Sequence, residues 1–176
     1  FFDDIEVSRP ALIRTLKAHQ NSLNIHDLLQ CAYKVNEKEK KALFDLLSDS
    51  INDDMISDLI NRLDGKDTNI KIHIIKLLDK FNRDDITRAL ENQLKDRKKN
   101  IRIAALNSLI KRKGKFNIEK IARLLNDPEI EIQDKTVDLI VKIRHPDTIK
   151  FLIPALKNES EYARRSAVEV LNEICD

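Results

Sequence analysis

The residues that could do chemistry are few and scattered along the chain. The four histidines are His19, His26, His73 and His145. None lies in an HExxH or HxE arrangement, the spacings that would present metal ligands or a general base together. His26 is followed by Asp27 and preceded by Asn24, so we expect Asp27 to favour the dipole of a first helical turn. The sequence predicts no metal, no cofactor and no acid–base site.

The cysteines and glycines also lack a functional pattern. Cys31 and Cys175 form no CxxC pair, and Cys31 shares an apolar stripe with Leu28, which is typical of a small buried hydrophobe. Gly65 and Gly114 are isolated, so there is no glycine-rich phosphate loop. These features indicate reduced cysteines, an intracellular protein and no enzymatic activity.

One concentration of charge lies in residues 95–123. This segment is rich in lysine and arginine, and its only acidic residues are Asp96 and Glu119. The formal net charge of the whole chain, in contrast, is only +2. Such a segment is either a solvated face or a footprint for phosphates or an acidic partner. The candidate anion patch is Lys98, Lys99, Arg102, Arg112 and Lys113.

Helices are the elements that must position these residues. Charged residues make up 35% of the chain, with 2 glycines and 4 prolines, a composition typical of helical proteins. No apolar run approaches the roughly 18 residues that span a bilayer, and no signal peptide is recognisable, so we expect no membrane insertion and a cytoplasmic location. The chain begins at Phe1 without an initiator Met and stops within a helical pattern, which predicts a fragment of a longer protein.

Apolar residues recur with a period of 31 residues. Four anchor leucines are spaced by this interval, and each closes an apolar stripe: Leu63, Leu94, Leu125 and Leu156. An apolar residue lies four positions before each anchor, and others lie seven, twelve and fifteen positions after it, which is helical spacing on one face. The pattern predicts two amphipathic helices per repeat, with Asn69, Asn100 and Ser160 as caps of second helices.

The same interval divides residues 1–176 into a single repeat domain. The predicted parts are a half repeat at 1–20, a degenerate repeat at 24–49, and clear repeats at 54–81, 85–112, 117–143 and 148–175. Two short helices cannot bury their apolar stripes alone, so each repeat must pack on the next. The ends of such a stack should expose apolar faces.

The repeat resembles the HEAT-like family in its short bacterial form, the PBS-lyase type, in which Leu-x-Asp is followed by Val-Arg-x-x-Ala. Its best copy runs from Leu94-Lys95-Asp96 to Ile101-Arg102 and Leu106. Gln133 and Gly65 depart from the pattern, at the basic position and at the Asp position. The resemblance implies an all-α, right-handed α-solenoid of antiparallel two-helix repeats.

The resemblance also implies a function. HEAT-like stacks act as non-catalytic scaffolds or regulatory modules, so we expect a protein partner, or neighbouring domains of the same chain, on the concave face. Second helices line that face in the family, and their non-core offsets supply the candidate partner-binding residues Lys76, Lys80, Asn107, Lys111, Lys135, Lys142 and Arg165.

Two alternatives remain: nucleic-acid or other polyanion binding through residues 95–123, and an enzyme of the bilin-lyase type. The hydroxylases of the family bind iron through His-Glu pairs, which this sequence lacks. In the family, the position of Lys71, Arg102 and Arg164 bonds neighbouring repeats. If Arg102 instead faced the groove with Lys98 and Lys111, an anion site would be credible.

Overall fold

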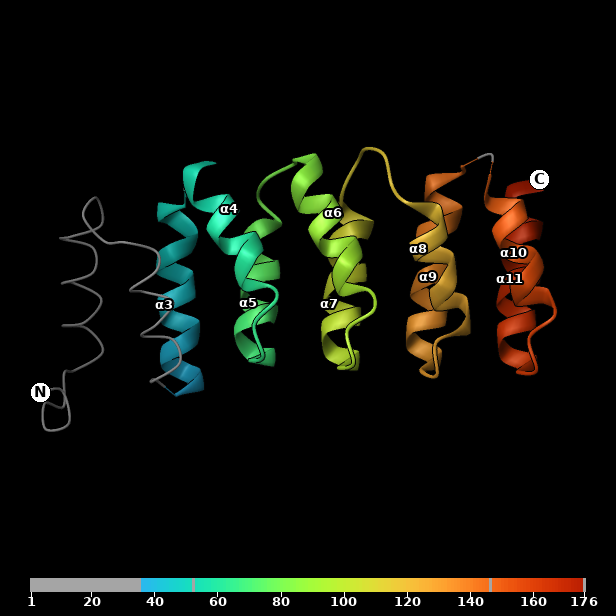
Figure 1. Ribbon diagram of the computed structural model, residues 1–176, viewed down its shortest axis with the longest axis horizontal. Helices are drawn as coiled ribbons and strands as arrows, with labels where there is room; N and C mark the ends of the chain where they lie inside the picture. The colour runs from blue at the N-terminus through green and yellow to red at the C-terminus, as the bar shows by residue number, and fades with distance from the viewer. Residues whose placement is uncertain (1–35, 52, 146, 176) are drawn as a thin grey trace, which may run out of the picture. The chain divides into compact units, whose positions relative to one another are not determined.

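The computed structural model describes residues 36–51, 53–145 and 147–175. The chain divides into two compact units, residues 1–78 and 79–176. The predicted half repeat at 1–20 and the first part of the degenerate repeat, including Cys31, lie outside the described residues. Every element of the described residues is a helix, and the predicted α-helical repeat class is confirmed (Figure 1). The single repeat domain over 1–176 stays a prediction.

The described part of the first unit contains three helices: α3 (Glu37–Ser50), α4 (Asp53–Arg62) and α5 (Thr68–Leu78). A capping box starts α3: the Asn36 side chain accepts bonds from the main-chain N–H groups of Lys38 and Glu39. In return, the Glu39 carboxylate accepts from the Asn36 N–H at 3.0 Å. These bonds satisfy donors that the first helical turn leaves without main-chain partners.

Both α3 and α4 pack on α5 in the first unit. Leu59 and Ile74 are fully buried there, and Phe44 is 4% exposed. The ring of Phe44 stacks on that of His73, with centroids 4.5 Å apart and planes 8° apart. His73 therefore packs against an aromatic ring within the first unit.

The second unit contains three helical hairpins. The first is α6 (Asp84–Gln93) with α7 (Lys99–Lys111), and the third is α10 (Thr148–Leu156) with α11 (Glu161–Cys175). Between them lie α8 (Ile118–Ala122), the 3₁₀ turn η1 (Arg123–Asn126) and α9 (Ile130–Ile143). Second helices pack in the order α7, α9, α11, and α8 packs on α10 (Figure 1). The hairpins thus form two layers, one of first and one of second helices.

The 31-residue pattern corresponds to the buried core. The anchors Leu63, Leu94 and Leu125 are at most 3% exposed, whereas Leu156 in the last hairpin is half-buried. Residues seven positions after each anchor are all buried: Ile70, Ile101, Ile132 and Ala163. The leucine period therefore marks positions that apolar packing removes from water.

Leu106 provides a test of this packing. It is fully buried on α7, whereas Val168, at the same register position of α11, is 46% exposed. We expect Leu106→Ala to lower the free energy of unfolding by about 2–5 kcal/mol, because it removes buried methyl groups and leaves a cavity. Val168→Ala, the matched control, should change it by less than about 0.5 kcal/mol. Urea unfolding monitored by circular dichroism measures both; equal losses would contradict the assignment of Leu106 to the core.

Candidate functional site

The turns between paired helices are held by one recurring side-chain bond. The residue eight positions after each anchor in the second unit reaches back six residues to a main-chain carbonyl oxygen. Arg102 Nη1 donates to the Asp96 carbonyl at 2.9 Å, and Gln133 Nε2 donates to the Asp127 carbonyl at 2.6 Å. Arg164 Nη1 donates to the Asn158 carbonyl at 2.7 Å. A long polar side chain at this position therefore closes each turn.

Asp or Asn side chains begin the second helices. The Oδ1 atoms of Asp96, Asp127 and Asn158 accept from the main-chain N–H two residues later, at 2.8, 3.0 and 2.8 Å. In the first unit, Asp67 Oδ1 accepts from the N–H of Asn69 at 2.9 Å. Such turns satisfy donors at a helix start. The predicted cap Asn69 is therefore a donor to the capping side chain rather than the cap itself.

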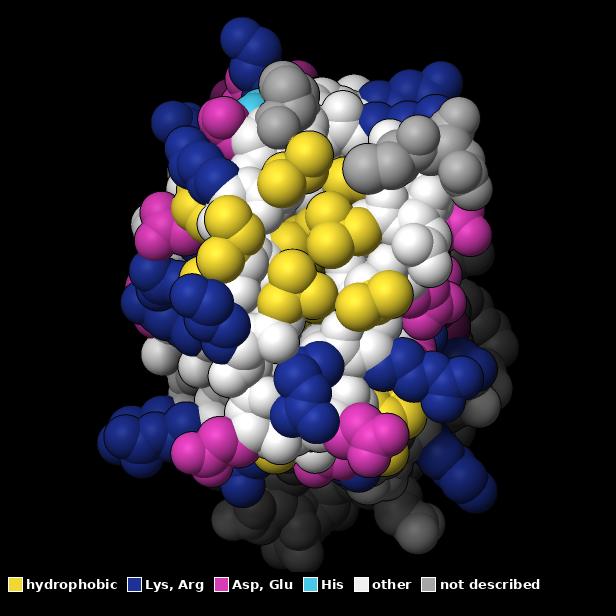
Figure 2. Space-filling view, turned by 90° about the vertical axis from the view of Figure 1, so that its right-hand side faces the viewer, with side chains coloured by type: hydrophobic (Ala, Val, Ile, Leu, Met, Phe, Trp, Pro, Cys, Tyr) yellow, Lys and Arg dark blue, Asp and Glu magenta, His cyan; other side chains and the backbone are white. Residues whose placement is uncertain are grey.

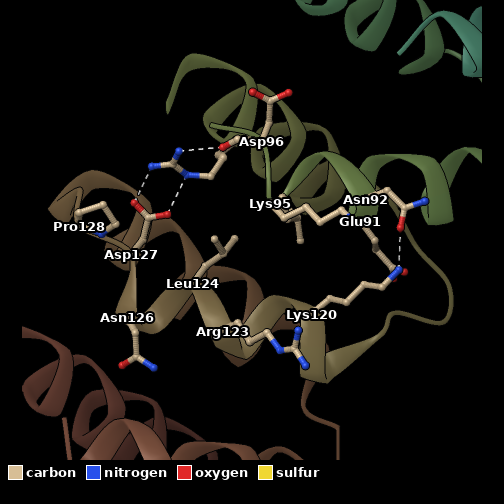
Figure 3. Close-up of a pocket in the computed structure, with 12 residues that line it drawn as sticks. Glu91, Asn92, Lys95, Asp96, Lys120, Arg123, Leu124, Asn126, Asp127 and Pro128 are labelled. Atoms are coloured by element: carbon tan, nitrogen blue, oxygen red, sulfur yellow. Dashed lines mark hydrogen bonds and ion pairs between the residues drawn. The ribbon is translucent and has the colours of Figure 1, made fainter. Parts of the chain in front are cut away.

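Arg102 also joins two hairpins through a buried ion pair with Asp127 of the next repeat. Its Nε lies 2.7 Å from Asp127 Oδ2, and its Nη2 donates to Oδ1 at 2.8 Å (Figure 3). The two side chains are 10% and 5% exposed. Two parallel contacts between a guanidinium and a carboxylate fix orientation as well as distance. Arg102 thus has the inter-repeat role that the family resemblance implied.

Removing Arg102 should cost more than removing its counterpart Arg164. Arg102→Met leaves Asp127 buried without its cation, and we expect a loss of about 3–5 kcal/mol in unfolding free energy. Arg164 closes its own turn but is exposed, so Arg164→Met should lose only about 1 kcal/mol. Adding Asp127→Asn to Arg102→Met should restore part of the loss, because Asn keeps the cap and removes the buried charge.

Urea denaturation of the three variants measures these differences. Because the chain contains no Trp, unfolding is followed by the helical circular-dichroism signal at 222 nm and not by tryptophan fluorescence. If Arg102→Met and Arg164→Met lost the same free energy, the contact between hairpins would contribute nothing beyond the turn.

A cavity of about 450 Å³ lies beside this ion pair, between the first and second hairpins. Arg102 and Asp127 form one side of it, and Lys120 Nζ donates to Asn92 Oδ1 at 2.8 Å on another (Figure 3). The lining residues include neither His nor Cys nor Ser, and their charges have both signs. The cavity offers polar contacts but no nucleophile beside a base.

The candidate anion patch is divided by the structure. Lys98 and Lys99 lie at the start of α7, whereas Arg112 and Lys113 follow its end. The 13 residues of α7 separate the two groups by about 20 Å at 1.5 Å per residue. Arg102, the fifth member, is buried in its ion pair. The five residues therefore do not form one cluster.

The two groups also differ in exposure. Lys98, Lys99 and Lys113 are exposed, with Lys99 Nζ 3.5 Å from a Glu129 carboxylate oxygen. Arg112 is 6% exposed and its Nη1 donates to the Phe81 carbonyl at 2.6 Å. Burial lowers the pKa of the Arg112 guanidinium below its ordinary value, and the nearby Asp79 opposes this shift. Arg112 contacts the protein interior instead of forming part of an open anion surface.

Five of the candidate partner-binding residues lie on second helices of the second unit. Asn107 and Lys111 are on α7, Lys135 and Lys142 on α9, and Arg165 on α11. Arg165 is exposed, and Asn107 is half-buried. Lys135 Nζ is 4.0 Å from a Glu131 carboxylate oxygen. The other two candidates, Lys76 and Lys80, are exposed at the end of α5 and just after it.

Two of these lysines bond to residues that lie about one repeat period earlier in the second unit. Lys111 Nζ lies 2.7 Å from Asp79 Oδ2, and Ser108 donates to the other oxygen of the same carboxylate. Lys142 Nζ donates to the carbonyl of Ile110. These partners are 32 residues apart in sequence, close to one repeat period. No sequence pattern singled out Asp79 or Ser108.

The part of the chain that the structure describes holds no group of three or more His, Cys, Asp or Glu side chains that could bind a metal ion. Its helices are too short or too polar to cross a membrane.

Amphipathic hairpins that stack in register and share polar bonds at their turns define an α-helical repeat protein. Residues 118–176, which contain α8 to α11, match the family model described as HEAT repeats. The predicted resemblance to HEAT-like repeats is therefore confirmed, and the match covers the last two hairpins.

Solved structures and curated sequences add little to this assignment. One solved chain, titled as the crystal structure of an engineered protein from the Northeast Structural Genomics Consortium, is 15% identical. The alignment covers 92% of this chain and 78% of that one, with a TM-score of 0.47. No curated protein matches the chain.

Proposed function

We propose that the protein is a non-catalytic scaffold that binds a segment of a protein partner across the second helices α7, α9 and α11. HEAT repeats generally mediate protein–protein interactions, and the packing order of these helices supports this surface. A stack of similar helices offers an extended surface of repeated contacts, which suits an elongated partner.

The observation that carries the proposal is the way exposed positions line up between these helices. Positions that repeat every 31 residues form rows across α7, α9 and α11. One row contains the half-buried apolar residues Ile110 and Val141. Another contains Asp138 and Glu169, which are exposed acids. An apolar row beside an acidic row can bind an amphipathic helix whose apolar face is bordered by basic side chains.

The lysines of the surface form a third row. Lys111 and Lys142 share this row, each four residues after a member of the row that contains Asp138 and thus on the same helix face. Each of them also bonds to a residue about one period earlier, Asp79 or Ile110, so its position is restrained before a partner arrives. Restrained side chains lose less conformational freedom on binding than free ones do. These lysines would contact acidic groups of the partner segment that lie beyond its basic side chains.

The division of the basic patch weighs against polyanion binding as the main role. Nucleic-acid affinity depends on several cations that contact phosphates together. Lys98 and Lys99 are separated from Lys113 by the length of α7, and Arg102 and Arg112 are buried. We expect no salt-dependent binding to duplex DNA or RNA, measured by fluorescence anisotropy at low salt.

Charge reversal tests the acidic row. We expect Asp138→Lys combined with Glu169→Lys to weaken partner binding about tenfold, or about 1.4 kcal/mol, because basic partner groups would face like charges. Glu159→Lys is the matched control, since Glu159 is an exposed acid in a turn outside this surface. Photo-crosslinking from position 107 in the native host, with a crosslinker at exposed Arg88 on α6 for comparison, identifies and quantifies the bound protein. Equal adducts from both positions would contradict the proposed surface.

A further inference from the structure

The last hairpin of the second unit exposes apolar side chains together on one face. Ile149 and Ile153 of α10 are each 49% exposed, and Val168 of α11 is 46% exposed. Figure 2 looks onto this face: hydrophobic side chains gather at its centre, with lysine, arginine and acidic side chains around them. We call this surface, defined by Ile149, Ile153 and Val168, the end face. A contiguous apolar patch with a polar rim is typical of an interaction site.

The register of these residues indicates what such a face contacts. Ile118, Ala122 and Val137 lie one period earlier, and they are only 4%, 4% and 6% exposed. The third hairpin covers them, because α8 and η1 pack on α10, and α9 packs on α11. The end face therefore repeats, at the same positions, the surface that buries a helical hairpin inside this molecule.

An anchor position and the position fifteen residues after it follow the same rule. Leu125 and Ile140 are fully buried in the second hairpin, while their counterparts Leu156 and Leu171 are half-buried in the third. Five register positions on two helices thus lose burial in parallel at the last hairpin. This parallel loss points to an occupant that contacts both α10 and α11, as a two-helix unit does.

We propose that the end face binds a two-helix hairpin of the HEAT-like type, presented by a polypeptide partner and stacked as α10–α11 stacks on α8–α9. Such a unit would cover Ile149, Ile153 and Val168 with the apolar stripes of its two helices. The proposal concerns a surface different from the second-helix rows, so it does not depend on the function proposed above.

The polar rim defines the chemistry of this occupant further. At the existing interface, Asn158 Nδ2 donates to Asn126 Oδ1 at 2.8 Å, and the Tyr162 hydroxyl donates to Asp134 Oδ1 at 3.2 Å. One period later, the positions of Asn126 and Asp134 are taken by Lys157 and Arg165, both exposed. At these two positions, cationic side chains thus replace hydrogen-bond acceptors. The occupant should therefore carry acceptors, preferably carboxylates, at the positions that correspond to Asn158 and Tyr162 of the third hairpin.

The test adds such a hairpin to the full chain. A second copy of residues 145–175 is appended after Asp176, which places one further repeat beside the end face at high effective concentration. We expect the melting temperature to rise by about 5 °C, because a nearest-neighbour interface is gained. Hydrogen exchange should slow at the amides of α10 and α11. Changing the Tyr of the appended copy to Asp, opposite Arg165, should raise the melting temperature further.

Ile153→Lys makes the test decisive. Ile153 is exposed, so this substitution should shift the melting temperature of the original chain by less than about 2 °C while cancelling the gain in the extended chain. A gain that survives Ile153→Lys, or unchanged exchange in α10 and α11, would overturn the proposal. Sedimentation equilibrium of the original chain provides a separate check. Self-association that Ile153→Lys abolishes would make a second copy the occupant and would also overturn it.

Discussion

The structure depends on one constraint: a pair of short helices cannot bury its own apolar stripe. Each hairpin of the second unit has apolar residues on both sides, and packing against neighbours removes them from water. The consequence is a core that continues from hairpin to hairpin rather than a single centre. Position in the stack therefore determines burial, which explains why Leu106 and Val168 differ although they share a register position.

Polar bonds add direction to this packing. Apolar stripes alone would allow hairpins to slide or rotate against each other, whereas the Arg102–Asp127 pair fixes both distance and orientation. The side-chain bond to the turn carbonyl is made by Arg102, Gln133 and Arg164 in successive hairpins. The hydrogen bond is therefore retained where Gln133 replaces the charged arginine. The charge of Arg102 stabilises the contact with the next hairpin, whereas its N–H donor stabilises the turn.

Much of the fold could be predicted from sequence because the apolar period depends on local helix geometry and on one repeated packing solution. The helix pairing, the buried anchors and the structural use of Arg102 follow from that period and from the family pattern. The division of the candidate anion patch could not be predicted from the period. Its cations look contiguous in the sequence, but the 13 residues of α7 separate the two groups. The contact between Asp79 and Ser108 could not be predicted, because it joins positions 29 residues apart that carry no apolar signal. Cap assignment failed at Asn69 because Asp67 is an equally good local acceptor.

The turn bonds also differ in strength along the second unit, with a consequence for the order of unfolding. An ion pair joins the first and second hairpins, but the corresponding positions at the next interface are Gln133 and Asn158, and Asn158 contacts Asn126 through neutral amides. Among the described residues, no ion pair adds to the packing between the second and third hairpins as one does between the first and second. Local opening should begin at α10–α11 and leave residues 84–143 folded, so the last hairpin behaves as a detachable cooperative unit.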